Sequence, residues 1–384
     1  MPPAKQCRKF RLKRLLLKGA IGRHAWHEFW GVKATMNGSK NRGLHRGFFL
    51  ASAASFVAAV LGASAARADD HQTYAVFDAV FLGRDNVSAN QPLVINATTL
   101  VPNISAQEMQ FATQPGIRLF YGMARVDDVS WELGYLGVWN MFADANVTDP
   151  GNLAVAGDLG LFLPSDQSVA RATYNSSLNT AEANIFIHRY DGGPNRTSGK
   201  PWQRCDGYSG GSVDWLAGFR WAGLDESATL ALSDPGSTNY SVRSTSNLFG
   251  AQAGARGRME WDRWAFEGWA KAALAGSALS QSQNAIMDPL TGDVLRTAAS
   301  SNETGVGLIG DINASLIYRL SETWGLRVGY NLIWLSGVAL APNQFNMGTT
   351  PSSGTSGEFL GSTTLNGGSS VFLQGANLGL EARW

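Results

Sequence analysis

Few residues in this chain have a type and spacing that could support catalysis or metal binding. Outside an amino-terminal leader, defined below, the histidines are His71 and His188. A Ser-His or Asp-His mechanism would have to use His188, which lies among aromatic residues in "NIFIHRY" and is better explained as a structural histidine. No zinc ligands stand at a recognised spacing, and no glycine-rich phosphate-binding motif follows a strand and opens a helix. The sequence therefore predicts no enzyme, no cofactor and no metal site.

Three weaker candidates have simpler explanations. The pairs Asp127-Asp128 and Asp225-Glu226 could hold a calcium ion, but solvated turn carboxylates are the better explanation. Cys205, in "QRCDGYSGG", is the one cysteine after the leader, so the exported part has no internal disulfide framework. We interpret Cys205 as incidental, with an intermolecular thiol role as the alternative.

The leader occupies residues 1–68. An apolar run at 47–61, "GFFLASAASFVAAVL", follows Lys40, Arg42 and Arg46 and precedes a small-residue exit that ends at Ala68. This is the pattern of a secretory signal peptide cleaved after Ala68. A membrane-spanning helix is the alternative, but it needs about 20 apolar residues. Because the charged region is long, Met36 is a possible true start, and a genuine extended leader is the other interpretation.

Removal of the leader changes the charge of the remainder, 69–384, which we expect to form one domain. The chain has 31 basic and 30 acidic residues, and 13 of the basic and 1 of the acidic residues lie in 1–68. The remainder therefore has 18 basic and 29 acidic residues and a net charge of −11. Affinity for nucleic acid depends on clustered lysine and arginine, so nucleic acid is excluded as a partner.

The remainder shows a two-residue hydrophobic period. Trp131, Leu133, Tyr135, Gly137, Trp139 and Met141 alternate with a more polar set, and Trp324 to Trp334 does the same. Successive strand side chains point to opposite faces, so each segment is a strand with one apolar face. Two segments are less regular: both faces are mixed in 72–84, and in 239–260 the alternation slips near Leu248 and Phe249, as a β-bulge would produce.

Alternation also fits a soluble β-sandwich, but strand length and the aromatic positions favour a membrane barrel. Ten steps of about 3.3 Å give an apolar face roughly 33 Å long, which at a tilt of about 40° matches the roughly 25 Å apolar band of a transmembrane barrel. Aromatic residues border this band at both ends as two girdles. The predicted girdle residues are Trp131, Trp139, Trp215, Trp221, Trp264, Tyr318, Trp324, Trp334 and Trp384.

Short and long connections alternate, as in bacterial outer-membrane barrels with short periplasmic turns and long outer loops. Tight turns are expected at 125–128, 260–263 and 320–323, and long outer loops at 85–110, 144–178, 281–302 and 337–369. Segment 191–211 is an exception, because it is a long connection on the periplasmic side.

The fold class is therefore all-β, an antiparallel transmembrane β-barrel of 10–12 strands. Ten strands are predicted at 72–84, 111–124, 129–143, 180–190, 212–232, 239–260, 264–280, 303–319, 323–336 and 370–384. A hidden pair at 153–163 or 191–211 would make twelve.

A family resemblance is visible in the second half. "SNLFGAQAGARGRMEWDRWAFEGWAKAALAGS" (246–277), "GLIGDINASLIYRLSETWGLRVGYNLIWLSGVALAPNQ" (307–344) and "VDWLAGFRWAGLDE" (213–226) resemble the putative beta-barrel porin family of planctomycete bacteria. The resemblance covers much of 212–344 and is weak over 85–210. It implies an outer-membrane barrel and transfers no catalytic residue.

The inward-facing polar residues are the remaining functional candidates. They are predicted to line the lumen, and they are Arg118, Glu132, Arg220, Arg256, Glu267, Lys271, Asp311, Arg319, Arg327 and Asn331. They could line a water-filled pore or pair across the lumen and plug it, since small barrels are filled by side chains. We expect a narrow porin-like channel in the bacterial outer membrane for passive diffusion of small hydrophilic solutes. The alternative is a plugged barrel with a structural or adhesive role through its outer loops. The sequence leaves the oligomeric state open.

The final residues predict how the barrel is assembled. Asn377, Gly379, Ala382 and Trp384 resemble the carboxy-terminal signal by which the barrel assembly machinery recognises its substrates, although Ala382 is smaller than is usual there. The simpler alternative is that the chain ends in a strand whose last residues have no role in recognition. We expect membrane lipid and this machinery as partners.

Deletion of Trp384, or addition of a charged tail after it, is predicted to impair insertion because the terminal aromatic would be lost or displaced. Immunoblots of outer-membrane fractions measure this. Normal membrane levels of either variant would contradict the prediction.

Overall fold

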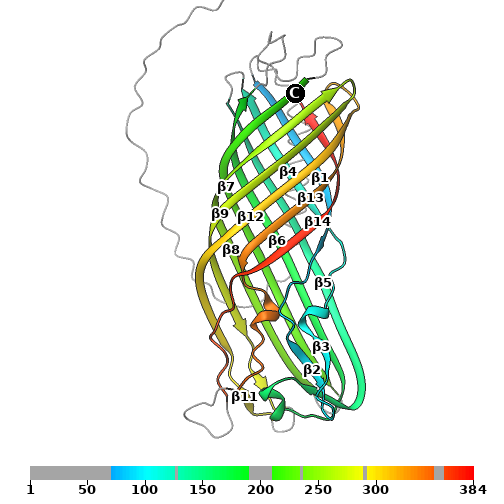
Figure 1. Ribbon diagram of the computed structural model, residues 1–384, viewed down its shortest axis with the longest axis vertical. Coiled ribbons are helices and arrows are strands. Elements are labelled where there is room, and N and C mark those ends of the chain that lie inside the picture. The colour runs from blue at the N-terminus through cyan, green and yellow to red at the C-terminus, as the bar shows by residue number, and fades with distance from the viewer. Residues whose placement is uncertain (1–70, 126–128, 190–209, 234–236, 289–291, 350–358) are drawn as a thin grey trace, which may run out of the picture. The chain divides into compact units, whose positions relative to one another are not determined.

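The computed structural model describes residues 71–125, 129–189, 210–233, 237–288, 292–349 and 359–384. Ten antiparallel strands form one closed barrel (Figure 1). They are β1 (His71–Arg84), β4 (Gln114–Arg125), β5 (Val129–Val155), β6 (Gln167–Arg189), β7 (Gly210–Ser233), β8 (Ser237–Trp261), β9 (Trp264–Gln283), β12 (Ala299–Arg319), β13 (Trp324–Val338) and β14 (Ser369–Arg383). The predicted all-β barrel fold is confirmed, with ten barrel strands in the described residues. The leader, 1–68, lies outside them.

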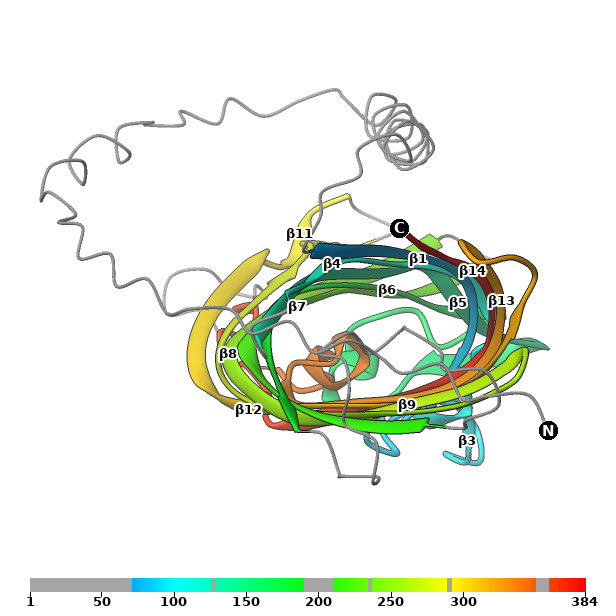
Figure 2. The same ribbon diagram turned by 90° about the horizontal axis from the view of Figure 1, so that it is seen from above.

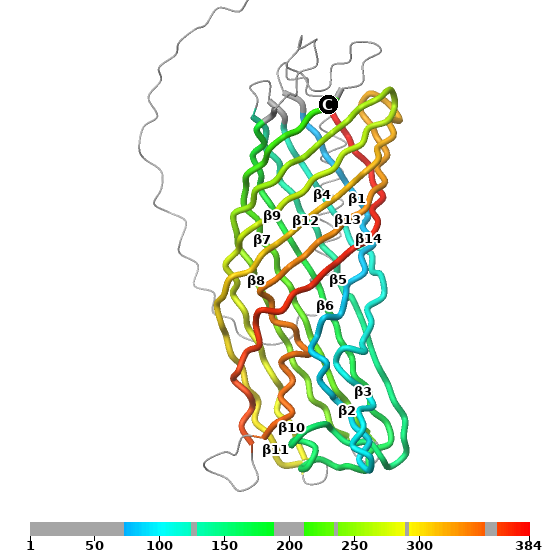
Figure 3. The backbone as a smooth tube through the Cα atoms, viewed as in Figure 1, coloured from blue at the N-terminus to red at the C-terminus, as the bar shows by residue number. Residues whose placement is uncertain are grey.

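The first and last strands close the barrel. β1 pairs with β14 from Tyr74 opposite Arg383 to Arg84 opposite Leu373, and the two strands run side by side in Figure 3. Thr73 and Trp384 exchange backbone hydrogen bonds of 2.9 and 3.0 Å at the end of this seam. Closure pairs both edges of the sheet, so these strands leave no free edge for another chain to join.

Alternation divides every strand between an inner and an outer row. The outer rows form an exposed apolar belt that includes Phe77, Phe81, Leu133, Ile185, Trp215, Phe219, Phe249, Phe266, Leu274, Leu308, Ile312, Leu316, Val328, Trp334, Leu378 and Leu380. In the part of the chain that the structure describes, no helix is long and apolar enough to cross a membrane.

The two ends of the barrel differ. At the end that we call the turn end, two-residue and four-residue turns join β8 to β9 and β12 to β13, and both chain ends of the barrel lie there (Figure 1). At the other, the loop end, β5 to β9 and β12 continue well past β1, β4, β13 and β14. There a hairpin of β2 (Pro92–Asn96) and β3 (Pro102–Ser105) pairs with the extended part of β5.

The segment 144–178 was predicted to be a long loop, and this was wrong. Most of it extends β5 and β6, and a short 3-10 helix, η3 (Asp158–Leu161), lies in the connection between them. Its polar composition suggested a loop, but polar residues also suit the part of a strand that projects beyond an apolar belt.

The strand β5 also contains a β-bulge that the sequence did not reveal. Register with β6 shifts between Val138 and Met141, and Asn140 between them has a positive φ of 56°. The extra residue reverses the alternation. Met141, predicted on the outer row with Trp139, therefore points inward and is fully buried.

The bulge predicted near Leu248 and Phe249 does not exist. β8 keeps continuous register with both β7 and β9 through this region. Leu248 is on the inner row and fully buried, whereas Phe249 is on the outer row and exposed. Because Leu248 on the inner row is also apolar, both faces of the strand carry an apolar residue at this point. The sequence pattern therefore looks like a slip in alternation although the register is continuous.

Candidate functional site: the barrel interior

The barrel interior contains three successive layers from the turn end to the loop end. The first is a charged layer with equal numbers of acidic and basic side chains. Its members are Asp78, Glu132, Glu182, Asp214, Glu267, Asp311 and Glu381 on the acidic side, and Arg118, Arg220, Arg256, Arg258, Lys271, Arg327 and Arg383 on the basic side. An apolar ring and a plug of loop segments follow.

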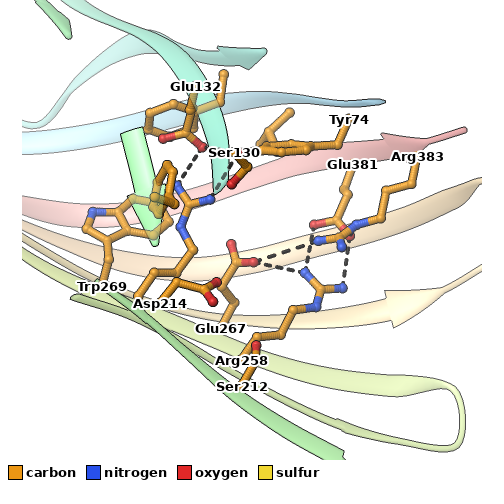
Figure 4. Close-up of a pocket in the computed structure, with 14 residues that line it drawn as sticks. Tyr74, Ser130, Glu132, Ser212, Asp214, Arg258, Glu267, Trp269, Glu381 and Arg383 are labelled. Atoms are coloured by element: carbon orange, nitrogen blue, oxygen red, sulfur yellow. Dashed lines mark hydrogen bonds and ion pairs between the residues drawn. The ribbon is translucent and has the colours of Figure 1, made fainter. Parts of the chain in front are cut away.

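A cluster of two carboxylates and two guanidiniums ties four strands together near the turn end. Figure 4 shows three of its members, Arg258, Glu267 and Glu381. Arg258 Nη1 donates to Glu267 Oε2 at 2.9 Å, and its Nη2 donates to Glu381 Oε1 at 3.0 Å. Arg327 Nη1 donates to Glu267 Oε1 and to Glu381 Oε2, both at 2.9 Å. Each carboxylate is therefore held by two cations, which is the compensation that a buried charge requires. Arg383 also donates to Glu381.

These side chains border a small, partly open pocket with a cavity volume of about 30 Å³. On its opposite side, Glu132 Oε2 accepts hydrogen bonds from the Tyr74 hydroxyl at 2.7 Å and from Arg256 Nη2 at 2.5 Å (Figure 4). The guanidinium of Arg256 lies 4.4 Å from the ring centre of Phe186. The pocket lies on the turn-end side of the charged layer, and the rest of that layer lies deeper in the barrel.

Deeper in the layer, each cation again has an acidic partner on another strand. Arg118 Nε donates to Asp78 at 3.0 Å, and Lys271 Nζ donates to Glu182 at 2.5 Å. Arg220 Nη1 donates to Asp311 at 2.9 Å. The side chains of Arg118, Asp78, Lys271 and Arg220 are at most 3 % exposed, so these pairs fill the lumen.

Amide side chains connect this network to the seam. Asn313 Nδ2 donates to Asn331 Oδ1 at 2.8 Å, and Asn331 Nδ2 donates to Asn377 Oδ1 at 3.1 Å. Arg118 also donates to Asn331. These contacts connect Arg118 on β4, through Asn331 on β13, to Asn377 on β14 beside the seam.

The apolar ring lies directly beyond the charged layer. Nine of the ten barrel strands contribute to it, and none of its members is more than 5 % exposed. They are Val80, Leu82, Leu136, Val138, Met141, Leu178, Ala222, Leu224, Leu248, Ala273, Ala275, Ile309, Ile333, Leu335, Val338, Leu340, Val371 and Leu373. All of them except Leu340, which belongs to the plug described next, lie on barrel strands, so side chains of the wall itself pack across the lumen at this level.

The plug is the segment 339–347, which contains the 3-10 helix η4 (Ala341–Gln344). Seen along the barrel axis in Figure 2, this orange segment lies within the ring of strands. Ser244 donates to the carbonyl of Ala339, and the Ala339 N–H donates to Ser246, at 2.8 and 3.0 Å. Phe345 and Met347 then pack in an apolar cluster with inner-row residues such as Tyr174 and Tyr240.

One buried carboxylate fastens the plug to the wall. Glu226 forms an ion pair of 2.7 Å with Arg84, and the side chains of both are fully buried. Glu226 Oε2 accepts hydrogen bonds from the Tyr174 hydroxyl at 2.8 Å and from the Ala341 N–H at 2.9 Å. A single carboxylate thus joins β1, β6, β7 and the plug.

All ten predicted lumen residues lie on inner rows. Nine belong to the charged layer or its amide network: Arg118, Glu132, Arg220, Arg256, Glu267, Lys271, Asp311, Arg327 and Asn331. Arg319 lies at the turn-end rim, partly exposed and paired with Glu260. Whether any of these residues contacts a solute stays a prediction.

The predicted girdle residues all lie on outer rows, toward the two edges of the belt. Trp139 Nε1 and the Tyr135 hydroxyl donate to Asn179 at 2.9 and 2.8 Å, and Trp221 Nε1 donates to Asn247 at 3.2 Å. Trp264 packs against Tyr318 with ring centres 4.8 Å apart and ring planes inclined at 58°. Contact of the girdle with lipid stays a prediction.

The predicted assembly signal also has structural roles. Asn377 is buried in the amide network, and a Cβ at Gly379 would lie 2.0 Å from Asp78 Oδ1, so the position accepts only glycine without a shift. Ala382 is buried in the seam region and Trp384 is half-buried. Recognition of these residues by an assembly machinery stays a prediction.

The predicted lumen set left out several interior charges, namely Asp78, Glu182, Asp214, Arg258, Glu381 and Arg383. Strand alternation alone places Asp214, Glu381 and Arg383 on the polar face of their strands, opposite the apolar row. Asp78 was hidden because its inner row also holds Tyr74, Val76 and Val80, which gave the mixed faces of 72–84.

The weaker chemical candidates gain no support. Glu226 points into the barrel and Asp225 outward, so this pair cannot bind one ion together. Cys205 and Asp127-Asp128 lie outside the described residues, and His188 pairs in register with Asp214. No group of three or more potential metal ligands occurs in the described ranges.

Comparisons with known proteins point to one family. The profile of the family described as Putative beta barrel porin-7 matches residues 172–384. No curated protein matches the chain. Among solved structures, the Pseudomonas putida toluene transporter TodX is 9 % identical, with 83 % of this chain and 90 % of that chain covered and a TM-score of 0.17. A Pseudomonas aeruginosa FadL homologue is 7 % identical, with 82 % of this chain and 90 % of that chain covered and a TM-score of 0.21. Likenesses with such TM-scores support no conclusion about this chain.

Replacement of Arg327 is predicted to destabilise the barrel strongly. Arg327→Met leaves Glu267 and Glu381 buried with fewer cations, which should lower the free energy of unfolding by about 3–5 kcal/mol. The matched control is Arg171→Met, because Arg171 forms an exposed ion pair of 3.2 Å with Asp144 whose loss should cost less than about 1 kcal/mol. Denaturant titration in detergent micelles, followed by tryptophan fluorescence, measures both. Equal losses for the two variants would contradict a structural role for the cluster.

Proposed function

Since the chain belongs to the Putative beta barrel porin-7 family, we propose that it is an outer-membrane barrel whose lumen is closed and whose projecting loop end forms an ordered surface outside the membrane. The observation that carries this proposal is the apolar ring, whose members are at most 5 % exposed. A conducting pore needs a continuous water path, and side chains buried to this degree across the lumen support a closed barrel at this level.

The exposed belt supports the membrane location. Large apolar residues cover the outer rows of the barrel strands, and Leu133, Leu274 and Val306 are 53 %, 64 % and 72 % exposed. A soluble protein seldom exposes so extensive an apolar surface. A lipid environment removes this cost, and export by the predicted leader would bring the chain to the outer membrane.

Three obstacles in series support the closed lumen. The charged layer is neutral and internally paired, the apolar ring belongs to the wall, and the plug is bonded to β7 and β8. A narrow channel for small hydrophilic solutes is the competing function. It would require water to pass all three levels, and removal of the plug alone would leave two of them intact.

The folded barrel is predicted to be electrically silent in planar lipid bilayers, because ions cannot cross the apolar ring. The heat-dependent gel shift of the same preparation shows that the barrel is folded, so that silence is not mistaken for failed insertion. Reproducible unitary current steps would overturn the closed-lumen proposal.

A labelling experiment tests the ring directly. In a Cys205→Ser background, Leu335→Cys should resist a charged maleimide in liposomes, because Leu335 is fully buried in the ring. The matched control is Ser212→Cys, which lines the partly open pocket at the turn end and should react in detergent solution and from the accessible side. Labelling of both positions at similar rates would indicate a water-filled lumen.

A further inference from the structure

The outer rows change character where six strands project past the apolar belt. On β5 to β9 and β12, the loop-end side of Trp139 and Trp221 carries mainly hydroxyl and amide side chains. We call this surface the wall face. Its polar members are Asp144, Asn146, Thr148, Arg171, Thr173, Asn175, Ser177, Asp225, Ser227, Thr229, Ser233, Ser237, Asn239, Ser241, Arg243, Thr245, Ser280, Ser282, Ser300, Asn302 and Thr304.

The wall face is a regular array. Asp144, Thr173, Thr229 and Ser241 are direct cross-strand neighbours, and so are Asn175, Ser227, Arg243 and Ser282. Neighbouring strands lie about 4.8 Å apart, and residues of one row repeat about every 6.8 Å along a strand. Hydrogen-bonding groups are therefore spread over a broad sheet surface and do not converge on one pocket.

The charge of this surface is low and balanced. Its charged members are Asp144, Arg171, Asp225 and Arg243. Arg171 forms an ion pair of 3.2 Å with Asp144, and Asp225 accepts a hydrogen bond from Thr245 at 2.9 Å. Phosphate groups are bound best by clustered arginine and lysine, so the wall face suits an uncharged, hydroxyl-rich partner.

The wall face continues the belt on the same strands and the same rows. On β8 the outer row runs from Phe249 through Asn247, Thr245 and Arg243, and on β7 from Trp221 to Asp225 and Ser227, without a change of register. If the belt contacts acyl chains, the wall face stands beside the headgroups of those same lipids. This step rests on the membrane placement proposed above and not on the closed lumen.

We propose that the wall face binds the neutral saccharide headgroups of glycolipids in the adjacent membrane leaflet. Serine, threonine and asparagine both donate and accept hydrogen bonds, as sugar hydroxyls do. Each bond is weak, but the array offers many at once. The interaction orders a shell of glycolipid around one side of the barrel and fixes the height of its loop end above the membrane.

Two lipid compositions test the proposal. The full barrel is placed in nanodiscs of phosphatidylcholine alone, or of phosphatidylcholine mixed with a dihexosyl diacylglycerol of matched acyl chains. The midpoint temperature of the heat-induced gel shift is expected to rise by several degrees with the glycolipid. Glycolipid should also remain bound to the extracted barrel in native mass spectrometry. No rise and no retained glycolipid would overturn the proposal.

Matched variants identify the surface. Thr173→Val with Thr229→Val removes two hydroxyls from the array and suits a strand, because valine has a high β propensity. This variant should lose at least half of the glycolipid-dependent rise, and Ser227→Ala with Ser241→Ala provides a second pair should the first not fold. The control is Thr98→Val with Thr99→Val in the exposed tip between β2 and β3, which should keep the full rise.

Each variant is compared with itself in the two lipids, so a change in its intrinsic stability cancels. An equal rise in the wall and control variants would overturn the assignment to this face. A rise caused by a free disaccharide in phosphatidylcholine discs would indicate a soluble saccharide partner instead. A larger rise with phosphatidylglycerol than with the glycolipid would likewise overturn it. None of these outcomes depends on bilayer conductance, so the glycolipid proposal and the closed-lumen proposal are tested independently.

Discussion

The interaction on which the barrel interior depends is the pairing of Glu267 and Glu381 with Arg258 and Arg327. These residues come from β8, β9, β13 and β14, so two carboxylates hold four strands from inside. Burial of an ion is unfavourable unless an opposite charge replaces its water. Removal of one member would leave another uncompensated, and the equal numbers of acidic and basic residues in the charged layer follow from this requirement.

The same constraint explains why the interior changes character along each strand. On β1 the inner row passes from Asp78 to Val80 and Leu82, and on β7 it passes from Arg220 to Ala222 and Leu224. A ten-stranded barrel leaves little space for water, so side chains must fill it. Near the turn end the fill is polar and opens to a pocket, whereas toward the loop end the wall packs on inserted loop segments and resembles the core of a globular protein.

Sequence patterns predicted the outer rows far better than the inner ones. The outer rows face one apolar surface, so alternation of large apolar residues located the strands and their number. The inner rows pack against different partners at each level, and an apolar inner residue such as Leu248 made the alternation look broken. Met141 could not be placed because one extra residue at Asn140 reverses the positions that follow it, as far as the next register shift after Thr148.

Contacts across the lumen were beyond reach for another reason. Arg118 meets Asn331 from a position 213 residues away, and Glu226 binds the backbone of Ala341 across a separation of 115 residues. Both contacts depend on the stagger of the strands around the closed barrel, which a single sequence does not encode as a local pattern. Strand alternation shows that such residues point inward, and only the closed structure shows which of them meet.

The arrangement of the layers separates the two ends of the molecule. The plug is held by Glu226, Ser244 and Ser246, so its release would expose the inner-row residues that it covers, such as Tyr174 and Tyr240. The apolar ring would remain, because residues such as Val80, Leu224 and Leu335 belong to the barrel strands and move only with the wall. Rearrangement of the loops and passage through the barrel are therefore distinct events. With the closed lumen proposed above, a surface at the loop end could bind a partner without any passage through the barrel, as a membrane-anchored structural or adhesive protein requires.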